Sequence, residues 1–302
     1  MSELSPLERE EYIEQHHFFT TLGQRLVENV PAQEVLALVR EEALATTKLP
    51  MAIDFLLAEL RHQGVFATGM NKLGHYFTPF QCYVISEAES DRRRFDLRIG
   101  LEILAREALY RTEPNVSRQG LFLYQFEALC RNRLGYDPGL EAMAQDPSFD
   151  QAWRDWILTV RRQIGIVELA DLIYVRSAFY LQRQGTTQRA DSSPSPEAAA
   201  GDRTARPESE GCLFGVREGR IAWANRQKDP LVLFAALHRQ LGYPQVPRTK
   251  TADPEERLLP VLARRVEQLD SRLKLLEEEQ RGGIQLERYY ARPDAEPPSG
   301  EP

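Results

Sequence analysis

The sequence predicts a mainly α-helical protein, built as a helical bundle with a small β-hairpin-plus-helix unit and a C-terminal coiled-coil helix. Three observations lead to this class. Apolar residues recur every three or four positions through most of residues 1–183. Prolines stand where these apolar runs begin or end. A hydrophobic content of 42% is enough for a core that leaves part of the chain outside it.

The predicted organisation has five parts. Residues 1–183 form the helical bundle, 184–210 a disordered linker, 211–248 the hairpin-plus-helix unit, 252–281 the coiled-coil helix and 282–302 a disordered tail. The linker is rich in Ser, Pro, Ala, Gly and charged residues, and it holds no large apolar residue. Such a segment cannot bury enough surface to offset the conformational entropy that it would lose on folding.

Proline and glycine delimit the first helices of the bundle. Ser5 can cap the free backbone amides of the first helix, and Pro6 suits its first turn. Pro31 opens the second helix, and Pro50 stands at the start of the third. The third helix ends at Gly64, which is placed to act as a left-handed cap. Short connections between such helices are typical of an antiparallel bundle.

Further helices are expected in the later part of the bundle. Pro79 opens a helix that could continue to Leu104, and further helices are expected over 119–134 and 150–164. Residues 166–181 suit either a strand or a helix. The sequence Leu-Gly-Tyr occurs at Gly135 and again at Gly242, each time followed by proline. We interpret both glycines as independent helix C-caps rather than as signs of a duplicated domain.

Beyond the linker, two short apolar runs flank a glycine. Residues 212–217 and 220–224 enclose Glu218-Gly219, which predicts a β-hairpin with Gly219 at the positive φ of its turn. A hairpin of this length is not stable alone. We therefore expect it to pack on the helix that begins at Asp229-Pro230.

Residues 252–281 carry an apolar seam with the spacing of a coiled coil. Its leucines and valine are alternately three and four residues apart, and charged residues flank them. Pro260 lies near its start, so the uninterrupted helix begins at that residue or just after it. The seam predicts self-association or pairing with a protein partner. The candidate interaction residues are Leu262, Val266, Leu269, Leu273 and Leu276.

Composition excludes several classes of protein. A net charge of -7 argues against nucleic-acid binding by the chain as a whole. Cys82, Cys130 and Cys212 are far apart and odd in number, which fits a reducing compartment better than a disulfide framework. The acidic N-terminus is unlike a signal peptide, and no run approaches the roughly 18 apolar residues of a membrane span. We expect a cytoplasmic protein, for which peripheral association with a membrane complex stays open.

A set of short elements between residues 18 and 104 resembles a known helical domain. The elements are Phe18 with Leu22, Asn29-Val30-Pro31, Gly64 with Gly69, Phe77-Thr78-Pro79, Ala88-Glu89, and Leu101 to Leu104. Together they resemble the cytoplasmic helical domain of the type II secretion and type IV pilus inner-membrane platform family. The family has Gly-Glu at the position of Ala88-Glu89, and it has transmembrane helices that this sequence lacks. The resemblance covers under a third of the chain. It implies a six-helix bundle that binds other proteins, and it implies no catalysis.

Two Glu-x-x-His pairs suggest an alternative function. Glu14 with His17 and Glu59 with His62 each have the i, i+3 spacing that di-iron carboxylate bundles use on two of their helices. A metal-dependent enzyme is therefore the alternative, although this spacing is common by chance on a solvated helix face. Neither a phosphate-binding glycine loop nor a nucleophile elbow is found, and no carboxylate stands in an apolar setting that would raise its pKa. We expect no cofactor.

The densest basic run is Arg92, Arg93 and Arg94, which could bind a phosphate or an acidic partner. Acidic residues surround it, which favours a solvated helix face. Taken together, the bundle, the flexible linker and the coil predict a non-enzymatic protein-protein interaction or scaffold protein. Binding is expected through the helical bundle and the C-terminal coil.

Overall fold

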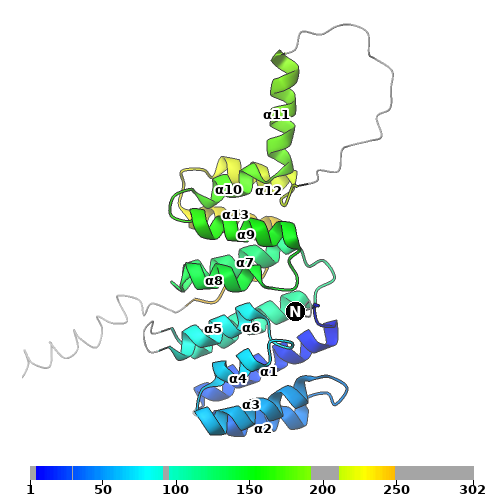
Figure 1. Ribbon diagram of the computed structural model, residues 1–302, viewed down its shortest axis with the longest axis vertical. Helices are drawn as coiled ribbons and strands as arrows, with labels where there is room; N and C mark the ends of the chain where they lie inside the picture. The colour runs from blue at the N-terminus through cyan, green and yellow to red at the C-terminus, as the bar shows by residue number, and fades with distance from the viewer. Residues whose placement is uncertain (1–4, 29, 91–94, 192–210, 249–302) are drawn as a thin grey trace, which may run out of the picture. The chain divides into compact units, whose positions relative to one another are not determined.

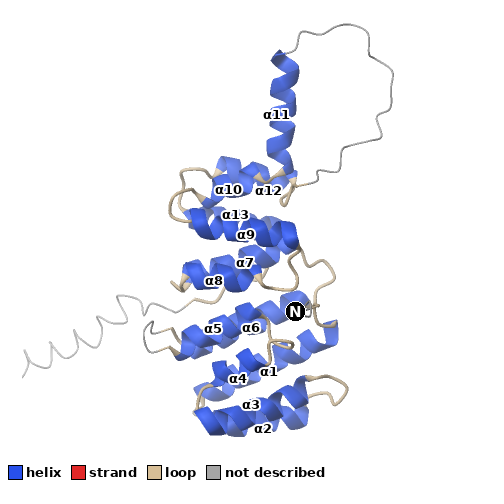
Figure 2. Ribbon diagram, in the orientation of Figure 1, coloured by secondary structure: helices blue, strands red, loops and turns tan. Residues whose placement is uncertain are grey.

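The computed structural model describes residues 5–28, 30–90, 95–191 and 211–248. Within these ranges the chain forms thirteen helices, and its only β-type pairings are two isolated bridges (Figure 2). This confirms the mainly α class. No helix in these ranges is long and apolar enough to cross a membrane. The predicted coil at 252–281 and the predicted tail at 282–302 lie outside them.

Helices that are neighbours in sequence mostly pack side by side, as α2 does with α3, α4 with α5 and α8 with α9 (Figure 1). The first helix is an exception, since α1 lies along α6 and so brings the N-terminal region against the middle of the chain. The helices are α1 (Arg9–Val27), α2 (Ala32–Glu42), α3 (Leu49–Gln63), α4 (Phe66–Lys72), α5 (Pro79–Glu89), α6 (Leu97–Arg111), α7 (Arg118–Arg131), α8 (Tyr136–Ala144), α9 (Gln151–Gln163), α10 (Leu169–Val175), α11 (Ala178–Asp191), α12 (Val216–Ala224) and α13 (Pro230–Leu241).

One hydrophobic core joins residues on both sides of the segment 192–210. The ring of Phe214 lies 5.3 Å from that of Trp153, and the ring of Phe234 lies 6.1 Å from that of Phe126. Each fully buried aromatic side chain stabilises the fold by about 1.5–3 kcal/mol. Residues 211–248, which the sequence sets apart as a separate unit, therefore share the core of the bundle, and the described residues form one compact unit.

Several predicted helix ends are confirmed. Gly64 after α3 and Gly242 after α13 adopt the left-handed conformation, with φ of 69° and 68°. Asp229 caps α13, because its Oδ1 accepts the amide of Leu231 at 2.8 Å. The first helix, in contrast, begins at Arg9 and not beside Pro6.

A capping box opens α5 and fixes where the chain turns into that helix. Thr78 Oγ1 accepts the amide of Gln81 at 3.2 Å, and Gln81 Oε1 accepts the amide of Thr78 at 3.0 Å. The single helix predicted from Pro79 to Leu104 is wrong, because α5 ends at Glu89 and α6 begins at Leu97.

The prediction for Gly135 is also wrong. Gly135 has a φ of -66° and precedes α8, so it begins a helix instead of ending one. The left-handed residue near the end of α7 is Arg133, with a φ of 55°. Pro138, which the sequence suggested as a stop, lies in the first turn of α8, where its missing amide proton costs nothing.

The predicted β-hairpin is wrong as well. Residues 216–224 form α12, and Phe214 makes only an isolated parallel bridge with Ser177. Gly219 is required for packing rather than for a turn, since a Cβ on it would lie 2.1 Å from Ser177 Oγ and 2.8 Å from Phe179 Cβ. The two apolar runs are too short to distinguish the two-residue repeat of a strand from the 3.6-residue repeat of a helix.

Residues 166–181, for which the sequence allowed strand or helix, belong largely to α10 and α11. Helix α11 continues to Asp191, past Gln184 where the linker was predicted to begin. The remainder of that predicted linker, residues 192–210, lies outside the described residues.

The seven-residue helix α4 receives a carboxylate from α5. Glu89 accepts the backbone amides of Phe66 and Ala67, each at 2.7 Å. The first amides of a helix have no partner within it, and the helix dipole favours a negative charge at that end. Glu89 thus fixes the N-terminus of α4 against the end of α5.

Candidate functional site

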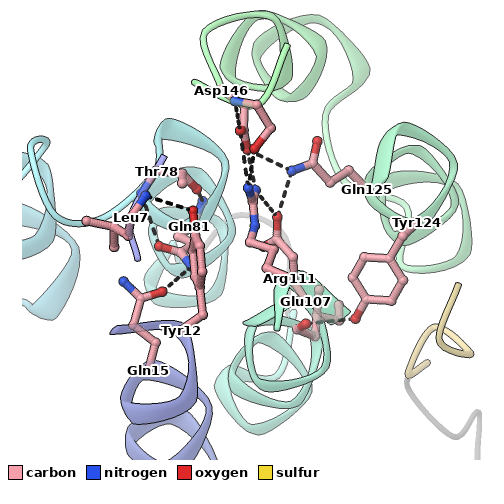
Figure 3. Close-up of polar contacts among 12 residues, drawn as sticks. Leu7, Tyr12, Gln15, Thr78, Gln81, Glu107, Arg111, Tyr124, Gln125 and Asp146 are labelled. Carbon is pink, nitrogen blue, oxygen red and sulfur yellow. Dashed lines mark hydrogen bonds and ion pairs between the residues drawn. The ribbon is translucent and has the colours of Figure 1, made fainter. Parts of the chain in front are cut away.

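A buried ionic cluster joins α6, α7 and the loop between α8 and α9 (Figure 3). Arg111 Nη2 donates to Glu107 Oε1 at 2.7 Å and makes a very short contact to Asp146 Oδ2. Gln125 Nε2 donates to the same two carboxylates, at 2.7 Å to Glu107 and 3.1 Å to Asp146. Ser148 completes the cluster, since its Oγ accepts from Arg111 Nη1 at 2.7 Å and its amide donates to Asp146 Oδ1 at 2.9 Å.

The two carboxylates of the cluster share one guanidinium, and their pKa values are shifted in opposite directions. Burial raises the pKa of Glu107, the charge of Asp146 adds to this, and Arg111 opposes it. Burial also acts to raise the pKa of Asp146, but the charge and hydrogen bonds of Arg111 and the amide of Ser148 outweigh it, so the pKa is lowered. The surroundings thus favour the protonated form of Glu107 and the ionised form of Asp146.

The cluster is closed to solvent and incompletely hydrogen-bonded. Glu107, Gln125 and Asp146 are fully buried, and the Arg111 side chain is 3% exposed. Glu107 Oε2, Arg111 Nε and Gln125 Oε1 have no hydrogen-bond partner within the described residues. Each such buried atom costs about 1–3 kcal/mol. The cluster holds α6, α7 and the loop between α8 and α9 in place. No substrate can reach it in this conformation.

Sequence reasoning missed the cluster, and its statement that no carboxylate stands in an apolar setting is wrong for Glu107. A local signal was present, since Glu107 and Arg111 are four residues apart on the helical face that also carries Leu104 and Ala108. The third charge, Asp146, follows 35 residues after Arg111, and nothing local connects the two.

A second buried polar chain links α1 to the start of α5, and Figure 3 shows part of it. Gln15 Nε2 donates to the carbonyl of Tyr76 at 3.2 Å, and Gln81 Nε2 donates to Gln15 Oε1 at 3.0 Å. Burial raises the pKa of the Tyr76 hydroxyl well above its ordinary value. These groups are part of the packing between helices and expose no reactive atom.

The four metal candidates are not brought into one ligand set. Glu14 Oε2 accepts the amide of Leu44 at 3.1 Å, and His17 Nε2 lies 3.1 Å from Glu42 Oε2. The first Glu-x-x-His pair is thus divided between a loop contact and a surface hydrogen bond.

The second pair has separate surroundings too. Glu59 pairs with Lys72 Nζ at 2.7 Å, and His62 is exposed. Across the described part of the chain, no group of three or more His, Cys, Asp or Glu side chains could hold a metal ion.

The remaining sequence candidates cannot be placed. Arg92, Arg93 and Arg94 lie outside the described residues, as do the five seam residues from Leu262 to Leu276. Their roles remain predictions from the sequence.

An apolar groove opens between α7, the start of α8, the loop 164–169 and the start of α13. It has a volume of about 490 Å³, which lies within the range of known ligand sites, about 300–1,000 Å³. Phe126 and Phe234 form part of its lining, together with Tyr136, Ile166 and Leu231. Ile166 is 83% exposed, Leu231 47% and Tyr136 40%. Contiguous exposed apolar side chains are one of the marks of a binding surface.

Two acidic residues and one cysteine also line the groove. Glu168 Oε2 accepts the amide of Gln227 at 2.8 Å, and Asp229 caps α13. Burial raises the pKa of Cys130 to about 11. Because the thiol stays protonated at neutral pH, Cys130 is not an activated nucleophile. The groove is therefore an apolar surface with an acidic rim.

Comparison with known proteins assigns no family to the chain: no family model matches it, and neither does any curated protein or solved structure. The resemblance of residues 18–104 to the secretion and pilus platform domain remains a prediction from the sequence.

Proposed function

We propose that this protein is a non-enzymatic interaction or scaffold protein, and that the groove between α7, α8 and α13 receives the apolar face of a helix from a partner protein. The observation that carries this proposal is the apolar groove itself, with Ile166 83% exposed beside it. Leaving such side chains in water is unfavourable by about 25 cal/mol for each Å² of apolar surface. A partner that covers them recovers this free energy.

The groove favours one kind of occupant. A helix presents apolar side chains at i, i+3, i+4 and i+7, and such anchors enter apolar grooves in many complexes. Glu168 and Asp229 place negative charge at the rim. Basic residues beside the apolar face of the partner helix would complement them and would speed association.

A labelled peptide tests the groove directly. The probe is a fluorescein-labelled amphipathic helix made of leucine and lysine, and its binding is followed by fluorescence anisotropy. Ile166→Asp and Leu231→Asp put a charge on the apolar surface, so we expect each to weaken binding by about tenfold or more. Met51→Asp is the matched control, because Met51 is 69% exposed on α3, away from the groove.

The results separate three cases. Loss of peptide binding in the two groove variants, with binding kept in Met51→Asp, supports the proposal. Equal loss in all three variants overturns it, because the peptide would then be responding to general charge. Binding of a small apolar dye to the groove without any binding of the peptide also overturns it, and indicates a small-molecule site.

The second part of the proposal is self-association through residues 252–281, and its support is the seam of five leucine and valine residues from Leu262 to Leu276. Light scattering on the full chain and on a chain without residues 252–281 tests it. A lower number of subunits after the deletion supports self-association, and an unchanged number contradicts it.

A further inference from the structure

The last described residues, up to Arg248, reach the helix that forms one wall of the apolar groove. Val246 is buried, and Asn132 Nδ2 donates to the carbonyl of Pro247 at 3.0 Å. Asn132 stands at the C-terminal end of α7, two residues after Cys130, which lines the groove. The chain that follows Arg248 therefore starts from a fixed point close to the groove.

The sequence after Arg248 has the apolar pattern and the charge that the groove favours. The seam from Leu262 to Leu276 places apolar residues at the i, i+4 and i+7 spacing of helices that bind in grooves. Residues 257–274 carry five basic and two acidic side chains, although the whole chain has a net charge of -7. The rim of the groove is acidic, since Glu168 and Asp229 line it. The segment and the groove are thus complementary in both respects.

The connection is long enough for the seam to reach the groove of its own chain. Leu262 follows Arg248 by 14 residues, which can span up to about 45 Å when extended. A connection of this length gives the two parts that it joins an effective concentration of about a millimolar. A segment tethered in this way competes with partner proteins that are present at lower concentrations.

We propose that residues 257–276 bind in the groove of their own chain and thereby block it to partner proteins. This inference rests on the proposed function of the groove and adds the means by which the groove is regulated. One apolar face cannot enter the groove and pair with a second copy at the same time. Self-association through the seam therefore frees the groove, and a partner helix binds by displacing the segment.

Two substitutions in the seam test the inference on the full chain. Leu269→Asp with Leu273→Asp, the seam variant, puts charges on the apolar face that enters the groove. We expect it to bind the fluorescein-labelled leucine and lysine helix about tenfold more tightly than the wild type, because the internal competitor is lost. Gln268→Asp with Ser271→Asp is the matched control, since it adds the same charge between the seam positions. Adding Ile166→Asp to the seam variant should remove the gain.

Hydrogen exchange gives a second readout that needs no probe. The loop 164–169 lines the groove, and Ile166 is 83% exposed within the described part of the chain. A segment bound in the groove covers this loop. The amides of residues 164–169 should therefore exchange faster in the seam variant than in the wild type and the control, while exchange in α3 stays unchanged. Light scattering at the same protein concentrations gives the number of subunits.

The outcomes distinguish this inference from the proposed function. Tighter probe binding and faster exchange of the loop in the seam variant support both. Equal probe binding by the wild type and the seam variant, lost on adding Ile166→Asp, keeps the proposed function and overturns the inference. If the probe binds neither protein, the proposed function fails, and unchanged exchange of the loop then overturns the inference as well. Protection of the loop only at concentrations where scattering shows more than one subunit assigns the segment to a second copy, which also overturns it.

Discussion

Arg111, in the last turn of α6, and Asp146, in the loop after α8, form a buried ion pair across 35 residues of chain. Glu107 and Gln125 complete the cluster, so α6, α7 and the loop after α8 meet at a buried site. Taking ions out of water is costly, and the mutual attraction of the group offsets that cost only while every partner is present. The cluster therefore makes the packing of α6, α7 and this loop mutually dependent.

Replacing Arg111 tests this dependence. Arg111→Met leaves two carboxylates buried without a cation, and we expect the free energy of unfolding to fall by about 3–5 kcal/mol. Urea denaturation followed by circular dichroism measures it. Arg98→Met is the control, because Arg98 also pairs with an aspartate but its side chain is 54% exposed. Similar losses in the two variants would contradict a special role for the buried cluster.

Glu107 makes stability depend on pH in a defined direction. A carboxyl whose pKa is higher in the folded than in the unfolded chain binds its proton more tightly when folded. Stability from this group is therefore present below the ordinary pKa of 4.5, and it is lost as the pH rises through the raised pKa of the folded state. Asp146 acts oppositely, because its stabilisation is present above its ordinary pKa of 3.8 and is lost as the pH falls through its lowered value.

Glu107→Gln isolates the first effect. Urea unfolding of the two proteins over a series of pH values gives the difference in their free energies of unfolding. We expect the variant to become more stable relative to the wild type as the pH rises from 4.5, because only the wild type carries the buried, ionising carboxyl. Glu102→Gln, on the exposed face of α6, is the control. A constant difference across the pH series would show that Glu107 does not titrate in this way.

Local signals allowed correct predictions where one residue decides the conformation. Gly64, Gly242 and Asp229 act within one or two turns of their own helices, and each was placed correctly. Gly135 and Gly219 could not be placed, because their roles depend on the next helix and on packing. Ser177 crowds the space where a Cβ on Gly219 would lie, and the sequence alone does not bring these two residues together.

The candidate site shows the same division between local and distant information. The pairing of Glu107 with Arg111 could have been found from its i, i+4 spacing, whereas the position of Asp146 depends on the path of α7 and α8. The groove was also beyond sequence reasoning, since Phe126, Ile166 and Phe234 meet there from three separated segments. Arg183 stacks on Trp223 although the two residues stand on opposite sides of residues 192–210 in the sequence.

The cap on α4 gives a third prediction. Glu89→Gln replaces a carboxylate that accepts from Phe66 and Ala67 with an amide that has only one acceptor oxygen. We expect a loss of about 1–3 kcal/mol, concentrated in α4. Hydrogen exchange at the amides of residues 66–72 should become faster while exchange in α7 stays unchanged. The exposed Glu34→Gln on α2 is the control, and a uniform acceleration throughout the protein would argue against a local cap.

Alanine variants of two glycines test close packing and helix propensity separately. A Cβ on Gly219 would lie 2.1 Å from Ser177 Oγ, so Gly219→Ala must displace α12 from α11, and we expect a loss of about 1–3 kcal/mol in unfolding free energy. Gly23 lies inside α1, and a Cβ there would meet Leu101 Cβ at an ordinary 3.6 Å. Gly23→Ala should therefore stabilise the protein, by about 0.5–1 kcal/mol, because alanine restricts the unfolded chain and favours the helix. Thermal and urea unfolding of both variants measure the two effects. A neutral Gly219→Ala would mean that α12 does not pack on Ser177 and Phe179 as closely as these distances require.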